Sequence, residues 1–310
     1  IGANMGLTRM THEHIFLCAT LKIPFVIIVT KIDYERENVL EKTTESIHKL
    51  LKLPGLRRIP YKVSNEDDVA ICSKNIHSDS IVPIFYVSNV TGTGIDNLKR
   101  FLNLSTKSSY NSNIENKSVE YHIDTTFSVP GVPTITGGQL ISGSIKIGDK
   151  LLLGPNNGKY DEVQVKTIHC KRVPMQSVRH GSYVCLGLKK IDRSSIRRGN
   201  VVLSLNSLQI SVMEFDAIIT VLKTHSSTIR KGYTPTINTF TTRQAAVLID
   251  IKDKVNEREN MMSESGEKSE EILRTGDKAT VTFRFKYHSE YLKVGMYLLM
   301  TEGKIKISGV

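Results

Sequence analysis

The chain has 310 residues, 39% hydrophobic and 24% charged, which is typical of a soluble globular protein of two or three domains. No apolar run reaches the ~18 residues that a membrane helix needs, which argues against a membrane-spanning chain. The net charge is +11, with 13 Lys and Arg against 11 Asp and Glu in residues 1–104 and 29 against 20 in the remainder. The basic remainder suits a polyanionic partner such as RNA, and charge alone equally allows a basic protein without one.

The four cysteines lie far apart and form no C-x-x-C pair, which favours a reduced intracellular compartment and gives no reason to expect a structural zinc site. The sequence shows no secretory signal peptide and begins with Ile1 rather than Met. We therefore interpret it as part of a longer protein, and we expect a cytoplasmic location with a monomer as the default state.

Residues 1–104 alternate between helical and strand patterns. Apolar residues recur at helical spacing from Met10 to Leu21, with Thr8 or Thr11 as the expected cap. The other expected elements are a strand at Phe25–Val29, a helix at Val39–Leu53, a strand at Ile84–Val87 and a helix at Ile95–Leu102. This alternation predicts a parallel α/β sheet.

Thr30-Lys31-Ile32-Asp33 follows the first expected strand and has the form [NT]-K-x-D. The Asp33 carboxylate can accept hydrogen bonds from both the N1–H and the 2-amino group of guanine, whereas adenine offers neither donor there. The Lys31 stem can lie along the base. A chain of this length contains such a tetrapeptide by chance about once in ten cases, so a solvated turn is the alternative.

A second polar loop, Ser88 to Gly94, follows the second expected strand. Ser88 and the amide of Asn89 could meet the guanine O6, and Thr93 or Asp96 could cap the following helix. This loop alone would be read as an ordinary strand–turn–helix connection. Two such strand ends, about 55 residues apart, predict neighbouring base-side loops of one nucleotide pocket.

The remaining sequence changes character. Residues 105–118 are rich in Ser, Asn and Lys and predict a linker, and many short strands separated by Gly, Pro and Asn-Gly turns follow. We expect two antiparallel β-barrels, at residues 119–208 and 209–310, with residues 252–271 as a disordered insertion in the second.

Several segments together carry a resemblance to a known family. They are Met10-Thr11-His12-Glu13-His14, Val87–Gly92, Phe127–Val132, Leu188–Ile191, Arg193–Gly199 and Arg274–Ala279. The chain resembles the translational GTPases related to elongation factor Tu, and most of all the eukaryotic family of GTP-binding proteins one and two. The likeness covers nearly the whole chain apart from residues 252–271.

The resemblance implies a GTP-driven switch that acts on aminoacyl-tRNA or the ribosome in translation or RNA surveillance, with GTP or GDP as ligand. It assigns guanine contacts to six residues: Thr30, Lys31, Asp33, Ser88, Asn89 and Val90. It implies Mg²⁺ in the intact protein, and no DNA or membrane partner.

The phosphate-handling motifs of a GTPase do not occur in this sequence. No G-x-x-x-x-G-K-[ST] is present, and Gly154–Tyr160 is a near miss that we interpret as a hairpin turn. By resemblance, the phosphate loop, the Asp-x-x-Gly element and the catalytic His would precede Ile1, and His12 and His14 do not replace them. We therefore expect no catalytic residue or metal ligand in this chain, and no GTP turnover above that of a Thr30–Asp33 mutant.

Two other functions remain open. The basic barrels, with clusters such as Lys171-Arg172, Lys189-Lys190 and Arg197-Arg198, would suit an RNA- or ribosome-binding module without hydrolysis. A plain scaffold with a decayed nucleotide site is the third possibility, which the intact loops argue against. Salt-dependent tRNA binding and the upstream sequence would separate the three.

Overall fold

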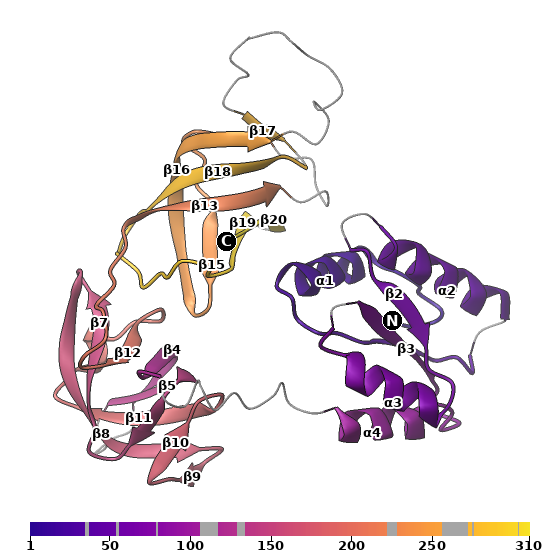
Figure 1. The fold of residues 1–310 in the computed structure, drawn as a ribbon, viewed down its shortest axis with the longest axis horizontal. Coiled ribbons are helices and arrows are strands. Elements are labelled where there is room, and N and C mark those ends of the chain that lie inside the picture. The colour runs from indigo at the N-terminus through magenta and orange to yellow at the C-terminus, as the bar shows by residue number, and fades with distance from the viewer. Residues whose placement is uncertain are drawn as a thin grey trace. The chain divides into compact units, whose positions relative to one another are not determined.

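The computed structural model of the protein describes residues 1–34, 37–53, 56–78, 80–105, 117–128, 134–221, 228–255, 272–274, 276–302 and 304–310. The chain divides into two compact units, Ile1–Tyr110 and Asn111–Val310 (Figure 1). This division falls within the segment predicted as a linker, whose residues 106–116 lie outside the described ranges.

The first unit is a parallel sheet with helices on both faces. Its strands are β1 (Ile27–Thr30), β2 (Ile59–Lys62) and β3 (Ile81–Val87), in the order β1-β3-β2. Its helices are α1 (Arg9–Thr20), α2 (Glu37–Leu51), α3 (Glu66–Asn75) and α4 (Ile95–Leu104).

Alternate residues of β3 face two separate cores. Ile84 packs with α1 and α2, whereas Phe85 and Val87 pack with α3 and α4, and the rings of Phe85 and Phe101 lie 5.2 Å apart. This is the period-2 alternation of a strand that is covered on both faces. The expected cap of α1 is confirmed, because Thr8 and Thr11 form a reciprocal capping box.

The sequence patterns missed β2 and α3. Pro60 interrupts the strand pattern, and the structure places β2 at an edge of the sheet, where proline is tolerated. The backbone amides of Ile59 and Val63 donate to the carbonyls of Ser80 and Ile84. The backbone nitrogens of Pro60 and Lys62 therefore point toward the open edge. Asn65 starts α3 through a capping box with Asp68.

The second unit begins with a closed antiparallel barrel. Its six strands are β4 (Glu120–Phe127), β5 (Thr134–Ser142), β7 (Lys150–Asn156), β8 (Lys159–Cys170), β11 (Tyr183–Lys189) and β12 (Val201–Ser204). Pairing of β11 with both β5 and β8 closes it. Smaller elements flank it: β6 (Ser144–Lys146), β9 (Val173–Pro174), β10 (Ser177–Arg179) and the 3₁₀ turn η1 (Arg193–Ser195). The near-miss glycine segment is a hairpin turn at Asn157-Gly158, as predicted.

A second closed barrel of six strands follows. They are β13 (Glu214–Val221), β15 (Thr236–Thr239), β16 (Thr242–Val255), β18 (Lys278–Phe285), β19 (Leu298–Glu302) and β20 (Lys304–Gly309). Two short strands, β14 (Thr228–Arg230) and β17 (Ile272–Arg274), pair beside it. The predicted fold class, a parallel α/β sheet followed by two antiparallel barrels, is confirmed.

Two expectations change on this fold. Residues 252–255 continue β16 and pair with β18, so they are not part of an insertion, and residues 256–271 lie outside the described ranges. Helix α4 starts from Gly94 without a side-chain cap, so neither Thr93 nor Asp96 caps it as expected. Among the helices in the described ranges, none is both long and apolar enough to cross a bilayer.

Gly94 allows an unusually close backbone approach. Its φ is +74°, and a Cβ built there would lie 2.1 Å from the carbonyl oxygen of Tyr86. Gly92 has a similar φ of +78°, with nothing within 4 Å of such a Cβ. We expect Gly94→Ala to lower the free energy of unfolding by about 2–4 kcal/mol, because conformational strain and a clash add. Gly92→Ala, the control, should cost about 1 kcal/mol. Urea unfolding measures both, and equal losses would contradict the close-approach argument.

Candidate functional site

The two predicted base-side loops leave the sheet side by side. β1 and β3 pair in parallel with Thr30 opposite Val87. The loop residues that follow each strand, Lys31–Asp33 and Ser88–Val90, therefore start at the same carboxyl edge of the sheet. This is where open parallel sheets bind ligands.

Thr30 is fixed on its other side as well. Its amide donates to the carbonyl of Ile1 at 2.8 Å, its carbonyl accepts from Ala3 at 2.9 Å, and its hydroxyl donates to the carbonyl of Ile1 at 3.4 Å. Lys31 then takes a left-handed conformation (φ +64°), which turns the chain at the strand end. Lys31 and Asp33 are both exposed, so the carboxylate is open to a ligand.

The second loop is organised by Ser88. Its side chain is completely buried, and its Oγ accepts from the amides of Val90 (3.2 Å) and Thr91 (3.1 Å). Its backbone amide donates to Thr93 and its carbonyl accepts from Gly92, both at 3.0 Å. The Ser88 hydroxyl is thus engaged within its own loop instead of being open to a base, whereas Asn89 and Val90 are exposed.

The chemistry of this edge fits a base better than a metal. It offers an exposed carboxylate, a lysine stem and an exposed loop backbone, which together can hydrogen-bond and cover a planar ring. Within the described ranges, no three His, Cys, Asp or Glu side chains gather where they could hold a metal ion.

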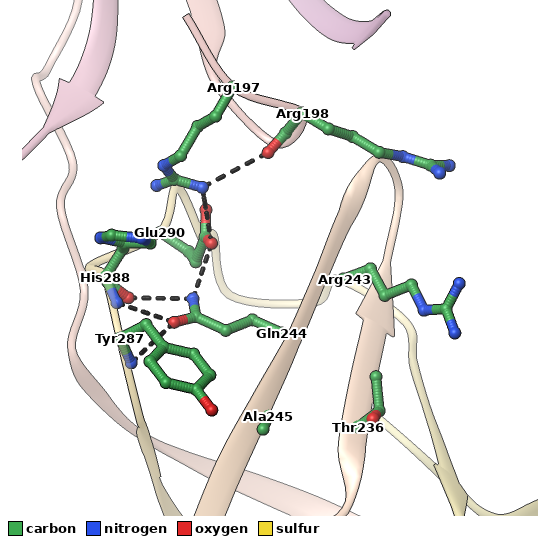
Figure 2. A pocket seen from close by; sticks show the side chains of 9 residues that line it. All are labelled: Arg197, Arg198, Thr236, Arg243, Gln244, Ala245, Tyr287, His288 and Glu290. Atoms are coloured by element: carbon green, nitrogen blue, oxygen red, sulfur yellow. Dashed lines mark hydrogen bonds and ion pairs between the residues drawn. The ribbon is translucent and has the colours of Figure 1, made fainter. Parts of the chain in front are cut away.

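A second polar site, which the sequence patterns missed, lies where the two barrels meet (Figure 2). Arg197 of the first barrel donates through Nη1 to both carboxylate oxygens of Glu290 at 2.7 and 2.8 Å. Gln244 donates to the same carboxylate at 2.7 Å, and its oxygen accepts from the amides of Tyr287 (2.9 Å) and His288 (2.7 Å). Burial raises the pKa of Glu290, although the bonds from Arg197 and Gln244 act to lower it.

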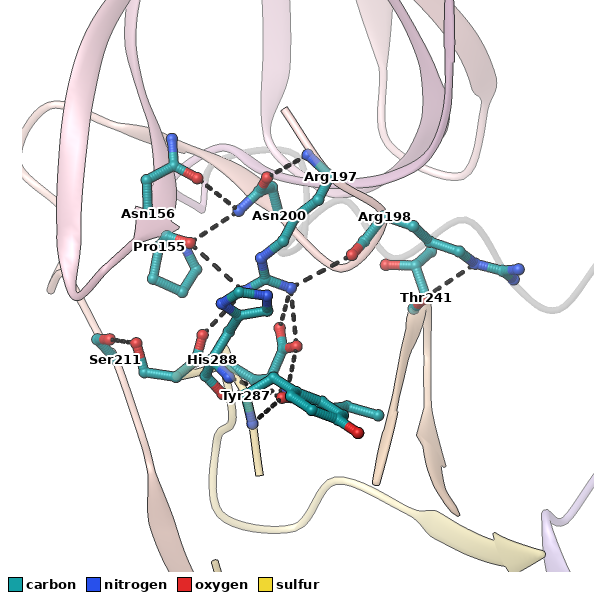
Figure 3. A network of polar contacts seen from close by, with 12 residues as sticks. Pro155, Asn156, Arg197, Arg198, Asn200, Ser211, Thr241, Tyr287 and His288 are labelled. Carbon is teal, nitrogen blue, oxygen red and sulfur yellow. Dashed lines mark hydrogen bonds and ion pairs between the residues drawn. The ribbon is translucent and has the colours of Figure 1, made fainter. Parts of the chain in front are cut away.

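Further hydrogen bonds fix the position of Arg197 between the two barrels (Figure 3). The amide of Arg197 donates to Asn200 at 2.7 Å, and the Asn200 side chain donates to the carbonyl of Pro155 at 2.9 Å. Nη2 of Arg197 reaches across to the carbonyl of Ser289 at 2.8 Å, and Ser211 bonds Ser289 at 2.7 Å. Arg197 is therefore committed to the junction, so it is not a free member of an RNA-binding cluster as the sequence suggested.

A hollow of about 440 Å³ opens beside this network. Its cationic lining includes Arg198 and Arg243, with Tyr287 and His288 on the other side (Figure 2). Arg198 also bonds Asp124 at 3.1 Å and the carbonyl of Thr241 at 3.1 Å. Three arginines line the hollow against one carboxylate, so the hollow is basic, and both barrels contribute to its lining.

A further contact joins the barrels through aromatic rings. Buried His122 lies between Phe240, stacked at 4.8 Å, and Tyr291, edge-on at 5.8 Å. His122 also bonds Glu120 at 2.9 Å, and Glu120 pairs with Lys293 of the second barrel. Burial acts to raise the pKa of Glu120, but the bonds from His122 and Lys293 outweigh it and lower that pKa.

A parallel sheet with adjacent polar loops at its carboxyl edge, followed by two six-stranded barrels, defines the three-part architecture of elongation-factor-type proteins. Two family models match: "Elongation factor Tu GTP binding domain" over residues 1–108 and "Elongation factor Tu domain 2" over residues 134–203. The chain belongs to the elongation factor Tu-like superfamily of translational GTP-binding proteins.

Individual relatives agree with this assignment. The chain is 41% identical to GTP-binding protein 1 of Xenopus laevis over 100% of its own length and 44% of that protein. It is 36% identical to human GTP-binding protein 2, over 99% of the chain and 49% of that protein. The chain thus spans about half the length of these curated relatives. The apo structure of translation elongation factor SelB from Methanococcus maripaludis shares the fold, with a TM-score of 0.71 at 20% identity over 100% of this chain and 62% of that one.

The ion pair between Arg197 and buried Glu290 predicts a large loss of stability when Arg197 is replaced. Replacing Arg197 by Met leaves Glu290 buried without its cation, which should lower the free energy of unfolding by about 3–5 kcal/mol. Arg198→Met is the matched control, because the Arg198–Asp124 pair is largely exposed and should contribute less than about 1 kcal/mol. Calorimetry of both variants decides the point, and similar losses in the two would refute it.

Glu120 predicts an acid-side loss of stability. Because its folded pKa lies below its ordinary value of 4.5, its contribution is complete above that value and is lost as pH falls through the folded pKa. Glu120→Gln should therefore show a smaller loss of unfolding free energy than the parent below pH 4.5. The parent is the required reference, since the raised pKa of Glu290 acts with the opposite sign. Parallel pH profiles of the two proteins would exclude this role.

Proposed function

We propose that the chain carries the guanine-reading side of a GTP-driven switch that acts on tRNA or the ribosome. The observation that supports it best is the parallel pairing of Thr30 with Val87, because it brings both polar loops to one sheet edge. Parallel sheets bind ligands at this edge, and the two loops offer hydrogen-bond donors and acceptors that match those of guanine.

Each loop residue has a role in this proposal. The exposed Asp33 carboxylate accepts from guanine N1–H and the 2-amino group, and Lys31 covers the base face. Thr30 braces the loop through its contacts with Ile1. In the second loop, the backbone N–H of Asn89 donates to the guanine O6.

Ser88 and Val90 act on the same loop in different ways. The Ser88 hydroxyl accepts from the amide of Val90, which holds the backbone around Asn89 in one conformation. Val90 is 85% exposed and presents an apolar side chain at the rim of the base site. The sequence predicted a contact of Ser88 with the guanine O6, and the burial of Ser88 favours this supporting role instead.

Hydrolysis belongs to the proposal for the complete protein. Residues 1–310 contain no phosphate-loop motif, so the groups that would hold the phosphates and Mg²⁺ are not among them. We propose that this chain selects guanine but does not by itself cleave GTP.

The proposed partner is tRNA or a ribosomal RNA surface in the cytoplasm. Relatives include proteins named elongation factor 1-alpha, such as that of Archaeoglobus fulgidus at 26% identity over 87% of this chain and 60% of that protein. The two barrels and their linker have nine more Lys and Arg than Asp and Glu. A non-hydrolysing RNA- or ribosome-binding module is the second candidate, which this basic charge favours.

The base assignment predicts an exchange of nucleotide preference in Asp33→Asn. The Asn amide offers a donor to the C2 oxygen of xanthine and leaves the guanine donors poorly paired, at a cost of about 1–3 kcal/mol. Fluorescent GDP and XDP titrations should show weaker GDP binding, by roughly 5- to 150-fold, and stronger XDP binding. Asp96→Asn, an exposed change on α4, is the control and should change neither. Unchanged preference in Asp33→Asn would count against the assignment.

A further inference from the structure

The positive charge of the first unit is concentrated in one short segment. Residues 46–65 contain five Lys and Arg and no Asp or Glu, whereas the rest of residues 1–104 contains eight against eleven. The first unit as a whole is nearly neutral, so this segment carries more than its entire excess. We name its five cations, Lys49, Lys52, Arg57, Arg58 and Lys62, the basic strap.

Backbone bonds hold the strap against the end of α2. The amide of Arg58 donates to the carbonyl of Leu51 at 2.9 Å, and that of Arg57 donates to Leu53 at 2.9 Å. Arg57 takes a left-handed conformation (φ +49°), which is uncommon for a residue other than glycine. The chain then continues directly into β2. The strap cations therefore extend from Lys49 near the end of α2 to Lys62 at the end of β2.

The far end of the strap is tied to the same helix. The ammonium of Lys62 lies 5.5 Å from the centre of the Tyr86 ring, and the Tyr86 hydroxyl bonds Thr44 of α2 at 3.0 Å. A cation over an aromatic face is favourably placed without being neutralised. Lys62 is therefore positioned by the fold while its charge remains uncompensated.

Four of the five strap cations are exposed to solvent, and three of these lack an ionic partner among the described residues. Lys49, Lys52, Arg57 and Lys62 are exposed, and Arg58 is half-buried. Lys49 has an exposed i−4 partner, Glu45, at 3.4 Å. Within the described ranges, Lys52, Arg57 and Lys62 have no carboxylate within 4.0 Å. Three of the five cations thus lie on one short segment without a carboxylate partner in the described ranges, although repulsion between like charges opposes this arrangement.

The chemistry of the strap favours phosphate over a protein surface. Lysine, which supplies three of the five cations, is depleted from protein–protein interfaces, whereas Lys and Arg both commonly contact nucleic-acid phosphates. Addition of a peptide strand at β2 is disfavoured, because Pro60 offers no N–H to the open edge and Lys62 is charged there. A polyanion approached by side chains alone meets neither obstacle.

We propose that the basic strap is an RNA phosphate-contacting surface on the nucleotide-binding unit, separate from the basic barrels. It rests on the proposed function only for the choice of RNA as the polyanion. Its contacts reach the backbone and carry no sequence preference. This chain would then contact RNA through both of its units.

The test is the salt dependence of RNA binding by a charge-neutralised variant. Lys52→Gln/Arg57→Gln/Lys62→Gln is compared with Lys42→Gln/Lys74→Gln/Lys99→Gln, three exposed lysines of the same unit outside the strap. The probe is a fluorescein-labelled, folded tRNA pool. The strap variant should bind about tenfold more weakly at low salt, and its log K against log salt slope should be shallower by about 2–3. The control should keep the parent slope.

Other outcomes would overturn the proposal. Equal slopes in the strap variant and the parent would refute a role of the strap in RNA binding. If Lys189→Gln/Lys190→Gln then showed a shallower slope, RNA would remain the partner in the proposed function. A strap-dependent slope for polyglutamate but not for tRNA would identify a surface for an acidic protein instead. Circular dichroism melting verifies that the same variants fold. GDP titration of these variants tests the guanine site independently of RNA binding.

Discussion

The parallel pairing of β1 with β3 is the constraint on which the candidate site depends. It sets Thr30 opposite Val87, so two segments more than fifty residues apart in sequence emerge at one edge. A shift of one residue in this register would reverse which side chains face each core, because Ile84 and Phe85 serve opposite faces. The two cores thus fix the register, and the register places the loops.

The barrel junction follows a different principle, in which buried charge is tolerated because it is fully paired. Glu290 is buried and Glu120 is half-buried, and their pKa values move in opposite directions. For Glu290 the cost of burial prevails over Arg197 and Gln244, whereas for Glu120 the bonds from His122 and Lys293 prevail. Each carboxylate is specific to one docking geometry, since neither barrel alone supplies all of its partners.

Much of the fold could be predicted from sequence, because hydrophobic periodicity and Gly or Pro punctuation are local signals. A threonine cap for α1 and the Asn157-Gly158 turn were predictable in this way. β2 was not, since Pro60 contradicts a strand unless its edge position is known. The buried role of Ser88 and the Arg197–Glu290 pair depend on contacts between distant segments, and no local pattern separates Arg197 from its exposed neighbour Arg198.

Gln244 has a mechanical consequence. One amide group binds the Glu290 carboxylate and, at its other end, the backbone of Tyr287 and His288, while the same carboxylate is gripped by Arg197. This series of bonds links Arg197 of the first barrel to strand β16 and to the segment after β18 in the second barrel. Rotation of one barrel against the other would break several of these bonds at once, which favours a single relative arrangement of the two barrels.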